Sequence, residues 1–213
     1  MKTLISVALL LTLSACGTVQ KAQYSALEKV GIHKRDILVD RIEATSETQE
    51  ETKEQFQSAY DELASLVKIE DGGLEKKYKK MAKAVEKSED KALELANRIN
   101  AVDEVAKALF AEWKAELNDY QSASLRQASA KNLNTTEQRY AKLYKKMQAS
   151  QKRVEPVLKV LQDNTLYLKH NLNARAINGL SNEVRLIEGK VAELIKQMEV
   201  SINESNKFVK SMR

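Results

Sequence analysis

Apolar and small side chains recur at alternating steps of four and three residues along much of the chain. The longest such series extends from Leu74 to Trp113, and shorter series with similar spacing lie at 140–168 and 180–202. The members of the longest series are Leu74, Tyr78, Met81, Val85, Ser88, Ala92, Leu95, Ile99, Val102, Ala106, Leu109 and Trp113. A repeat of 3.5 residues is typical of long helices that pack with a left-handed supercoil. We therefore predict an all-α protein with no strands.

Few segments interrupt this pattern. The pair Gly72-Gly73 offers the left-handed backbone conformation that ends a helix. Ser124, followed by Gln127, has the spacing of a capping box, and Asn173 can act as the N-cap of a last helix. Breaks at these points predict four helices, near 21–69, 74–120, 124–170 and 174–211.

The first three of these helices have matched lengths, each about 70 Å at ~1.5 Å per residue. Matched lengths favour an elongated antiparallel coiled coil, that is, a four-helix up-down bundle. The alternative is a three-helix bundle with one long continuous C-terminal helix over 124–211.

The N-terminus has the three-part layout of a secretory signal. Lys2 supplies a positive charge, residues 4–13 are apolar, and small residues precede Cys16. The apolar run is shorter than the roughly 20 residues that a membrane-spanning helix needs. We therefore predict a signal peptide at 1–15, followed by one elongated helical domain at 16–213.

Residues 13–16 (LSAC) are similar to the lipobox of bacterial lipoproteins, in which the Cys is acylated and becomes the new N-terminus. Since Cys16 is the only cysteine of the chain, we predict that it carries the lipid. The alternative is an ordinary cleaved signal followed by an unmodified Cys. Gly17, in place of Asp, favours the inner leaflet of the outer membrane, with the protein facing the periplasm.

Composition excludes several classes of protein. A single Cys cannot form a disulfide framework, and six Gly with one Pro among 213 residues leave few turns. The formal net charge of +5 lacks the concentrated basic stripe of a nucleic-acid-binding protein, so we expect no nucleic-acid partner.

Three charged segments stand out. Residues 43–55 are acidic and lack a large apolar side chain, whereas residues 139–153 hold six basic residues and no acid. If the chain folds at 72 and 122, these two segments lie at the same height, so we predict ion pairs between them that fix the register. The alternative is that the basic segment forms a face for an anionic lipid or an acidic partner. Lys76, Lys77, Lys79 and Lys80 form a third cluster, at one end of the rod. We identify it as a possible contact surface, although it could also be a solvated helix start.

Catalytic chemistry has little support in the sequence. His33 and His170 are the only histidines, fewer than the three ligands of a catalytic metal site. Motifs for nucleophilic catalysis, phosphate binding or paired cysteines do not occur. We therefore expect no cofactor, no metal and no enzymatic activity.

Four segments resemble one family. They are 24–41 (YSALEKVGIHKRDILVDR), 53–56 (KEQF), 108–117 (ALFAEWKAEL) and 155–177 (EPVLKVLQDNTLYLKHNLNARAI). They are similar to the domain-of-unknown-function 2959 family of Gram-negative bacteria, often described as lipoproteins. The resemblance implies a helical envelope protein and brings no activity or ligand. It includes His33 and His170 without assigning them a role.

These observations favour a lipid-anchored, non-enzymatic spacer, scaffold or adaptor of the cell envelope. Its expected partners are the membrane, through acylated Cys16, and a periplasmic protein; a homo-oligomer is possible. The alternative is a periplasmic holdase that binds unfolded clients with basic helical arms.

Overall fold

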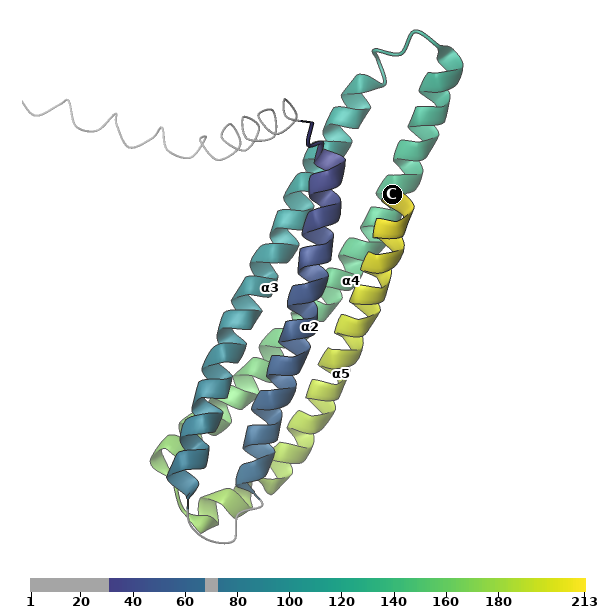
Figure 1. Ribbon diagram of the computed structural model, residues 1–213. Coiled ribbons are helices and arrows are strands. Elements are labelled where there is room, and N and C mark those ends of the chain that lie inside the picture. Colours follow the sequence, from purple (N-terminus) through teal and green to yellow (C-terminus); the bar gives the residue numbers. More distant parts are fainter. Residues whose placement is uncertain (1–30, 68–72) are drawn as a thin grey trace, which may run out of the picture.

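The computed structural model describes residues 31–67 and 73–213, and these form four long helices and no strands (Figure 1). The helices are α2 (Lys34–Leu66), α3 (Leu74–Glu116), α4 (Ala123–His170) and α5 (Ala174–Met212). The predicted all-α four-helix bundle is confirmed. Because the chain leaves the helical conformation at 171–173, the alternative with one continuous helix over 124–211 is wrong.

Each helix packs against two neighbours, and consecutive helices are antiparallel (Figure 1). The helix α2 lies between α3 and α5, and α4 also contacts α3 and α5. The helices α2 and α4 touch at few positions, because they occupy opposite corners of the bundle.

The core follows the predicted heptad positions. In α3, the side chains of Met81, Leu95, Ile99 and Val102 are almost fully buried, whereas Leu74, Tyr78 and Trp113 near its two ends are half-buried. In α5 the regular series continues as far as Met198, and the buried positions then pass to Ser201 and Ser205.

Several helix boundaries differ from the sequence prediction. The helix α2 begins at Lys34, after Gly31 in the left-handed region at φ 84°, and the predicted start near 21 lies outside the described residues. The N-cap of α4 is Ser122, whose Oγ accepts a hydrogen bond from the Leu125 N–H at 3.3 Å. The prediction of Ser124 as the N-cap was wrong. Ser122 and Ser124 are both close enough to cap the first turn of α4, and Ser122 is the one that does.

The α3–α4 hairpin extends beyond the other two helices at one end of the bundle (Figure 1). An ion pair of 2.8 Å between Lys34 Nζ and Glu112 Oε1 places the start of α2 level with the last turn of α3. Past that level, Trp113 Nε1 donates to Ser129 Oγ at 2.8 Å and joins the two projecting segments. We call this the hairpin end, and the opposite end, at Gly73 and 171–173, the far end.

A polar layer crosses the middle of the bundle core. The polar stretch of α2 turns Thr45, Thr48, Gln49 and Thr52 inward, with side chains 0–3% exposed. Gln49 Nε2 donates to Ser150 Oγ of α4 at 2.8 Å and to Ser201 Oγ of α5 at 3.0 Å. Among the described residues, neither Gln49 Oε1 nor Ser205 Oγ has a hydrogen-bond partner. A layer of this kind favours one register of the helices at a cost in stability.

This cost can be tested by replacing the layer with apolar side chains. We expect Gln49→Leu combined with Ser150→Ala and Ser201→Ala to raise the free energy of unfolding by about 1–3 kcal/mol, because an unpaired buried carbonyl is removed together with its neighbours' hydroxyls. Gln49→Ala alone should instead lower it, since it leaves a cavity and removes the hydrogen bond to Ser201 Oγ, whereas Ser150 Oγ keeps its bond to the Met147 carbonyl oxygen. Urea unfolding monitored by circular dichroism measures both. A triple variant less stable than the wild type would contradict this interpretation.

Candidate functional site

The N-terminal segment joins the bundle at the hairpin end. Cys16, the predicted lipidation site, lies outside the described residues. His33 precedes α2, and its backbone N–H donates to the Asp36 carboxylate at 3.3 Å, which also places a negative charge in the first turn of the helix. The described chain therefore begins at the end where α3 and α4 project (Figure 1).

The predicted lysine cluster lies at the far end, and its members have different environments. Lys77 Nζ donates to the Ser65 carbonyl oxygen at 3.2 Å, so this side chain closes the last turn of α2. Lys79 pairs with Glu75 at 2.7 Å. Lys76 and Lys80 are exposed and line a shallow hollow on α3 together with Lys83.

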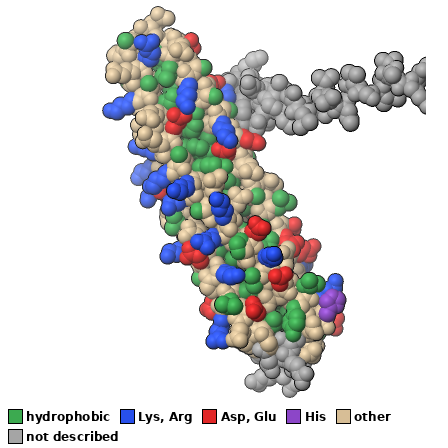
Figure 2. Space-filling view, turned by 180° about the vertical axis from the view of Figure 1, so that it is seen from behind, with side chains coloured by type: hydrophobic (Ala, Val, Ile, Leu, Met, Phe, Trp, Pro, Cys, Tyr) green, Lys and Arg blue, Asp and Glu red, His purple; other side chains and the backbone are tan. Residues whose placement is uncertain are grey.

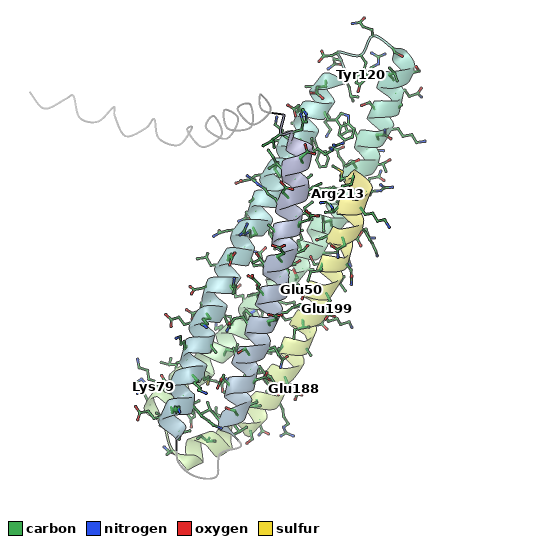
Figure 3. The ribbon with its side chains drawn as sticks, in the orientation of Figure 1. Glu50, Lys79, Tyr120, Glu188, Glu199 and Arg213 are labelled. Atoms are coloured by element: carbon green, nitrogen blue, oxygen red, sulfur yellow. The ribbon has the colours of Figure 1, made fainter. Side chains whose placement is uncertain are left out.

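Figure 3 shows Lys79 near one end of the rod and Tyr120, in the hairpin turn, at the other. The hydrogen bond from Lys79 lowers the pKa of the Glu75 carboxyl and raises the pKa of the Lys79 ammonium. Both groups are fully exposed, so solvent screens the pair. Among the described residues, Lys76 and Lys80 are the exposed cations of the cluster without a carboxylate in ion-pair distance, and Lys83 is a neighbour that the sequence analysis missed. Lys83 continues the same face one turn after Lys79 and Lys80, which is the signal that could have identified it.

The predicted ion pairs between 43–55 and 139–153 do not form. The predicted height is right, since Gln49 reaches Ser150, but α2 and α4 are diagonal in the bundle. The acidic stretch pairs with adjacent helices instead: Glu51 with Lys91 at 2.6 Å and Glu43 with Arg213 at 2.7 Å.

A further ion pair of α2 involves α5. In Figure 3, Glu50 and Glu199 lie close together, and Lys53 bridges them at 2.8 and 3.4 Å. The pKa of Lys91 is raised by its hydrogen bonds to Glu51 and Glu94. The basic residues of α4 are therefore not used to bind α2, and most of them remain at the surface.

These residues give the bundle a basic side. Figure 2 views the molecule from behind, the side of α4, and shows Lys and Arg side chains along one edge of it. In α4, Arg139, Lys142, Lys145, Lys152 and Arg153 are exposed. Because α2 carries an excess of acids and lies diagonally opposite, charge is separated across the width of the rod.

An aromatic cluster supports the basic side near the hairpin end. The Tyr140 ring contacts Phe110 at a centroid distance of 5.5 Å, Tyr144 at 5.8 Å and Phe208 at 6.1 Å, which joins α3, α4 and α5. Tyr140 Oη donates to Asp103 Oδ1 at 3.2 Å, and burial, more than the nearby carboxylate, raises the pKa of this phenol. Tyr140 therefore stays protonated and packed, as its heptad position indicates.

The two histidines lie at opposite ends of the bundle and cannot share a ligand within one chain. His33 precedes α2 at the hairpin end, and His170 is the last residue of α4 at the far end (Figure 1). Within 31–67 and 73–213, no group of three or more His, Cys, Asp or Glu side chains is placed to hold a metal ion. In the same ranges, every helix is too polar or too short to span a bilayer.

Comparisons with known proteins identify one family. A search of curated proteins and a search of solved structures each found no match. The chain matches DUF2959, described as a protein of unknown function, over residues 23–212. Since this match covers nearly all of the chain, the protein belongs to the DUF2959 family.

Proposed function

We propose that the protein is a lipid-anchored, non-enzymatic spacer or adaptor of the bacterial cell envelope, with Cys16 in the inner leaflet of the outer membrane and the bundle in the periplasm. The observation that carries this proposal is that the described chain begins, at residue 31, at the hairpin end of the bundle, and that the lipobox-like segment precedes this point in the sequence. The segment leads into α2 at the hairpin end, whereas the exposed lysines of the 76–80 cluster lie at the far end.

The length of the bundle would separate a surface at the far end from a membrane anchor at the hairpin end. The 33 residues of α2 span about 50 Å at ~1.5 Å per residue. Four packed helices hold this length without a flexible joint, so a surface at the far end is carried away from the membrane. Two or three acyl chains suffice for stable attachment, whereas a single chain is marginal.

The far end supplies a contact surface for an acidic protein partner. Lys76, Lys80 and Lys83 gather on one face of α3, and one carboxylate at that hollow, Glu75, is already neutralised by Lys79. Complementary charge at a rim of this kind raises the association rate and favours one partner over another.

In-cell photocrosslinking tests the adaptor role. A crosslinking residue in place of Lys80 should give a discrete adduct, and reversal of charge at Lys76 and Lys83 should reduce its yield at least about tenfold. The matched control is the same crosslinker at Lys107, an exposed lysine of α3 that pairs with Asp103 far from this end. Identical adducts from both positions, or an adduct insensitive to the charge reversals, would contradict the proposal.

A helix with few apolar side chains, such as the 43–55 stretch of α2, would favour the client-binding alternative if its polar side chains formed an open surface. In the structure, the Thr and Gln side chains of that stretch are buried in the polar layer and do not form an open surface. The observation is thus explained by packing, and the adaptor proposal is the one that the geometry supports best.

A further inference from the structure

A groove runs between α4 and α5 near the hairpin end, on the basic side of the bundle. It has a volume of about 440 Å³. Its lining residues are Arg139, Lys142, Glu204, Lys207, Phe208, Lys210 and Ser211. Four of these seven side chains are cationic, and they come from two antiparallel helices that face each other across the groove.

The groove has a surplus of positive charge. Its one carboxylate, Glu204, is 15% exposed and pairs with Lys142 at 2.9 Å. Within the part of the chain that the structure describes, Arg139, Lys207 and Lys210 have no carboxylate within ion-pair distance. Cations left without a counter-charge on a concave surface concentrate the local potential and attract anions.

The groove is also rigid at its base. Phe208 is 3% exposed and packs edge-on against the Tyr140 ring, which fixes α5 against α4 at this height. The cations lie three residues apart on each helix, Arg139 with Lys142 and Lys207 with Lys210, so each pair shares one side of its helix. The two pairs therefore face one groove from fixed backbone positions.

We propose that this groove binds a ligand that carries two or more phosphate groups. Arginine offers a planar fork that binds phosphate oxygens in bidentate fashion, and lysines add point charges around it. Cations on both walls, spread over one helical turn, fit a ligand with neighbouring phosphates better than a single small anion. Two sources share this chemistry: a soluble oligophosphate and the headgroup of a lipid with two phosphates. The inference rests on the groove alone and does not require acylation of Cys16.

A second copy of the chain fits the groove less well. The acidic surface that would complement it lies between α2 and α5, lined by Glu54, Asp61 and Glu62 beside Ile195. That surface lies toward the far end, whereas the basic groove lies toward the hairpin end. In a parallel arrangement of two copies, the acidic surface of one copy therefore does not meet the basic groove of the other.

Titration of the purified full-length protein with tripolyphosphate tests the proposal. We expect the triple variant Arg139→Gln, Lys207→Gln and Lys210→Gln to bind at least about tenfold more weakly than the wild type, and binding to weaken as salt is raised. The matched control, Lys76→Gln with Lys80→Gln and Lys83→Gln, removes the same charge at the far end and should bind within about twofold of the wild type. Circular dichroism checks that both variants are folded.

A second arm distinguishes the two sources. Phosphatidylcholine vesicles with and without cardiolipin are mixed with full-length protein carrying Cys16→Ser, so that acylation cannot contribute. Cardiolipin-dependent binding that the groove variant loses supports a lipid source, and tripolyphosphate binding without it supports a soluble one. Equal losses in the groove and control variants, or binding of neither ligand, would overturn the proposal. A salt-sensitive oligomer that only the groove variant loses, without phosphate binding, would assign the groove to a second copy instead.

Discussion

Replacement of Phe56 by Ala is expected to lower the free energy of unfolding by about 3–5 kcal/mol. Phe56 is fully buried, and it is the first large apolar side chain of α2 after Ile42. The positions between them face the core with Thr and Gln, which contribute little burial of apolar area. Loss of the ring therefore leaves a cavity beside a layer that is already poorly stabilised.

Urea unfolding monitored by circular dichroism gives this value. The matched control is Leu93→Ala, another large-to-small change in a helix, at a side chain that is 65% exposed. We expect the control to change the free energy by no more than about 0.5 kcal/mol. A loss below about 1 kcal/mol for Phe56→Ala, or equal losses for the two variants, would show that Phe56 does not hold α2 in the bundle.

Replacement of Cys16 by Ser is expected to abolish acylation entirely. In the proposed anchor the Cys16 thiol accepts the lipid, and a hydroxyl at this position cannot form the thioether. Each buried methylene contributes about 0.8 kcal/mol to membrane attachment, so loss of two or three acyl chains removes most of the binding free energy.

Metabolic labelling with a radioactive fatty acid, together with the mobility of the chain, measures this effect. The wild type should be labelled and lose residues 1–15, and globomycin should block that cleavage. The Cys16→Ser variant should be unlabelled and uncleaved. As a position control, Ser124→Cys in the Cys16→Ser background should not restore the label. A wild-type chain that is cleaved but unlabelled would show that Cys16 is an unmodified residue after an ordinary signal.

Much of the fold could be predicted from the sequence because it depends on local patterns. The spacing from Leu74 to Trp113 indicates a helix with one buried face, and the structure buries that face. The predicted break between the first two helices is present, but its role differs: Gly73, with a left-handed φ of 82°, is the N-cap of α3, and α2 already ends at Leu66. Scarcity of Gly and Pro limits the chain to few turns, which is enough to predict long helices but left both three and four of them open.

The arrangement of the helices around the bundle axis could not be predicted in the same way. Heptad spacing places a residue at a height and on a face, but it does not say which helix lies next to which. The acidic stretch of α2 and the basic stretch of α4 were therefore placed at the right height and wrongly paired, because α2 and α4 are diagonal. The buried role of Gln49 is hidden for a similar reason, since its partners Ser150 and Ser201 are far away in sequence.

The sequence shows that lysines cluster at 76–80, but it does not show that their surroundings differ. A run of lysines looks uniform in sequence. Whether a given ammonium lies at the surface depends on the neighbouring helix end, and Lys77 turns toward the Ser65 carbonyl at the end of α2. Lys83 was missed because it lies outside the run 76–80 in sequence, although it lies on the same face of α3.

The most direct measurement is the height of the two ends of the rod above the membrane. The acylated full-length protein is placed in vesicles that carry an energy acceptor on their headgroups, with a donor on Arg35→Cys or on Lys80→Cys. Since Lys77 contacts Ser65, residue 80 lies level with the last turns of α2, about 40 Å from Arg35 at ~1.5 Å per residue. An upright rod predicts strong transfer from position 35 and much weaker transfer from position 80. Equal transfer from both positions would contradict the spacer arrangement.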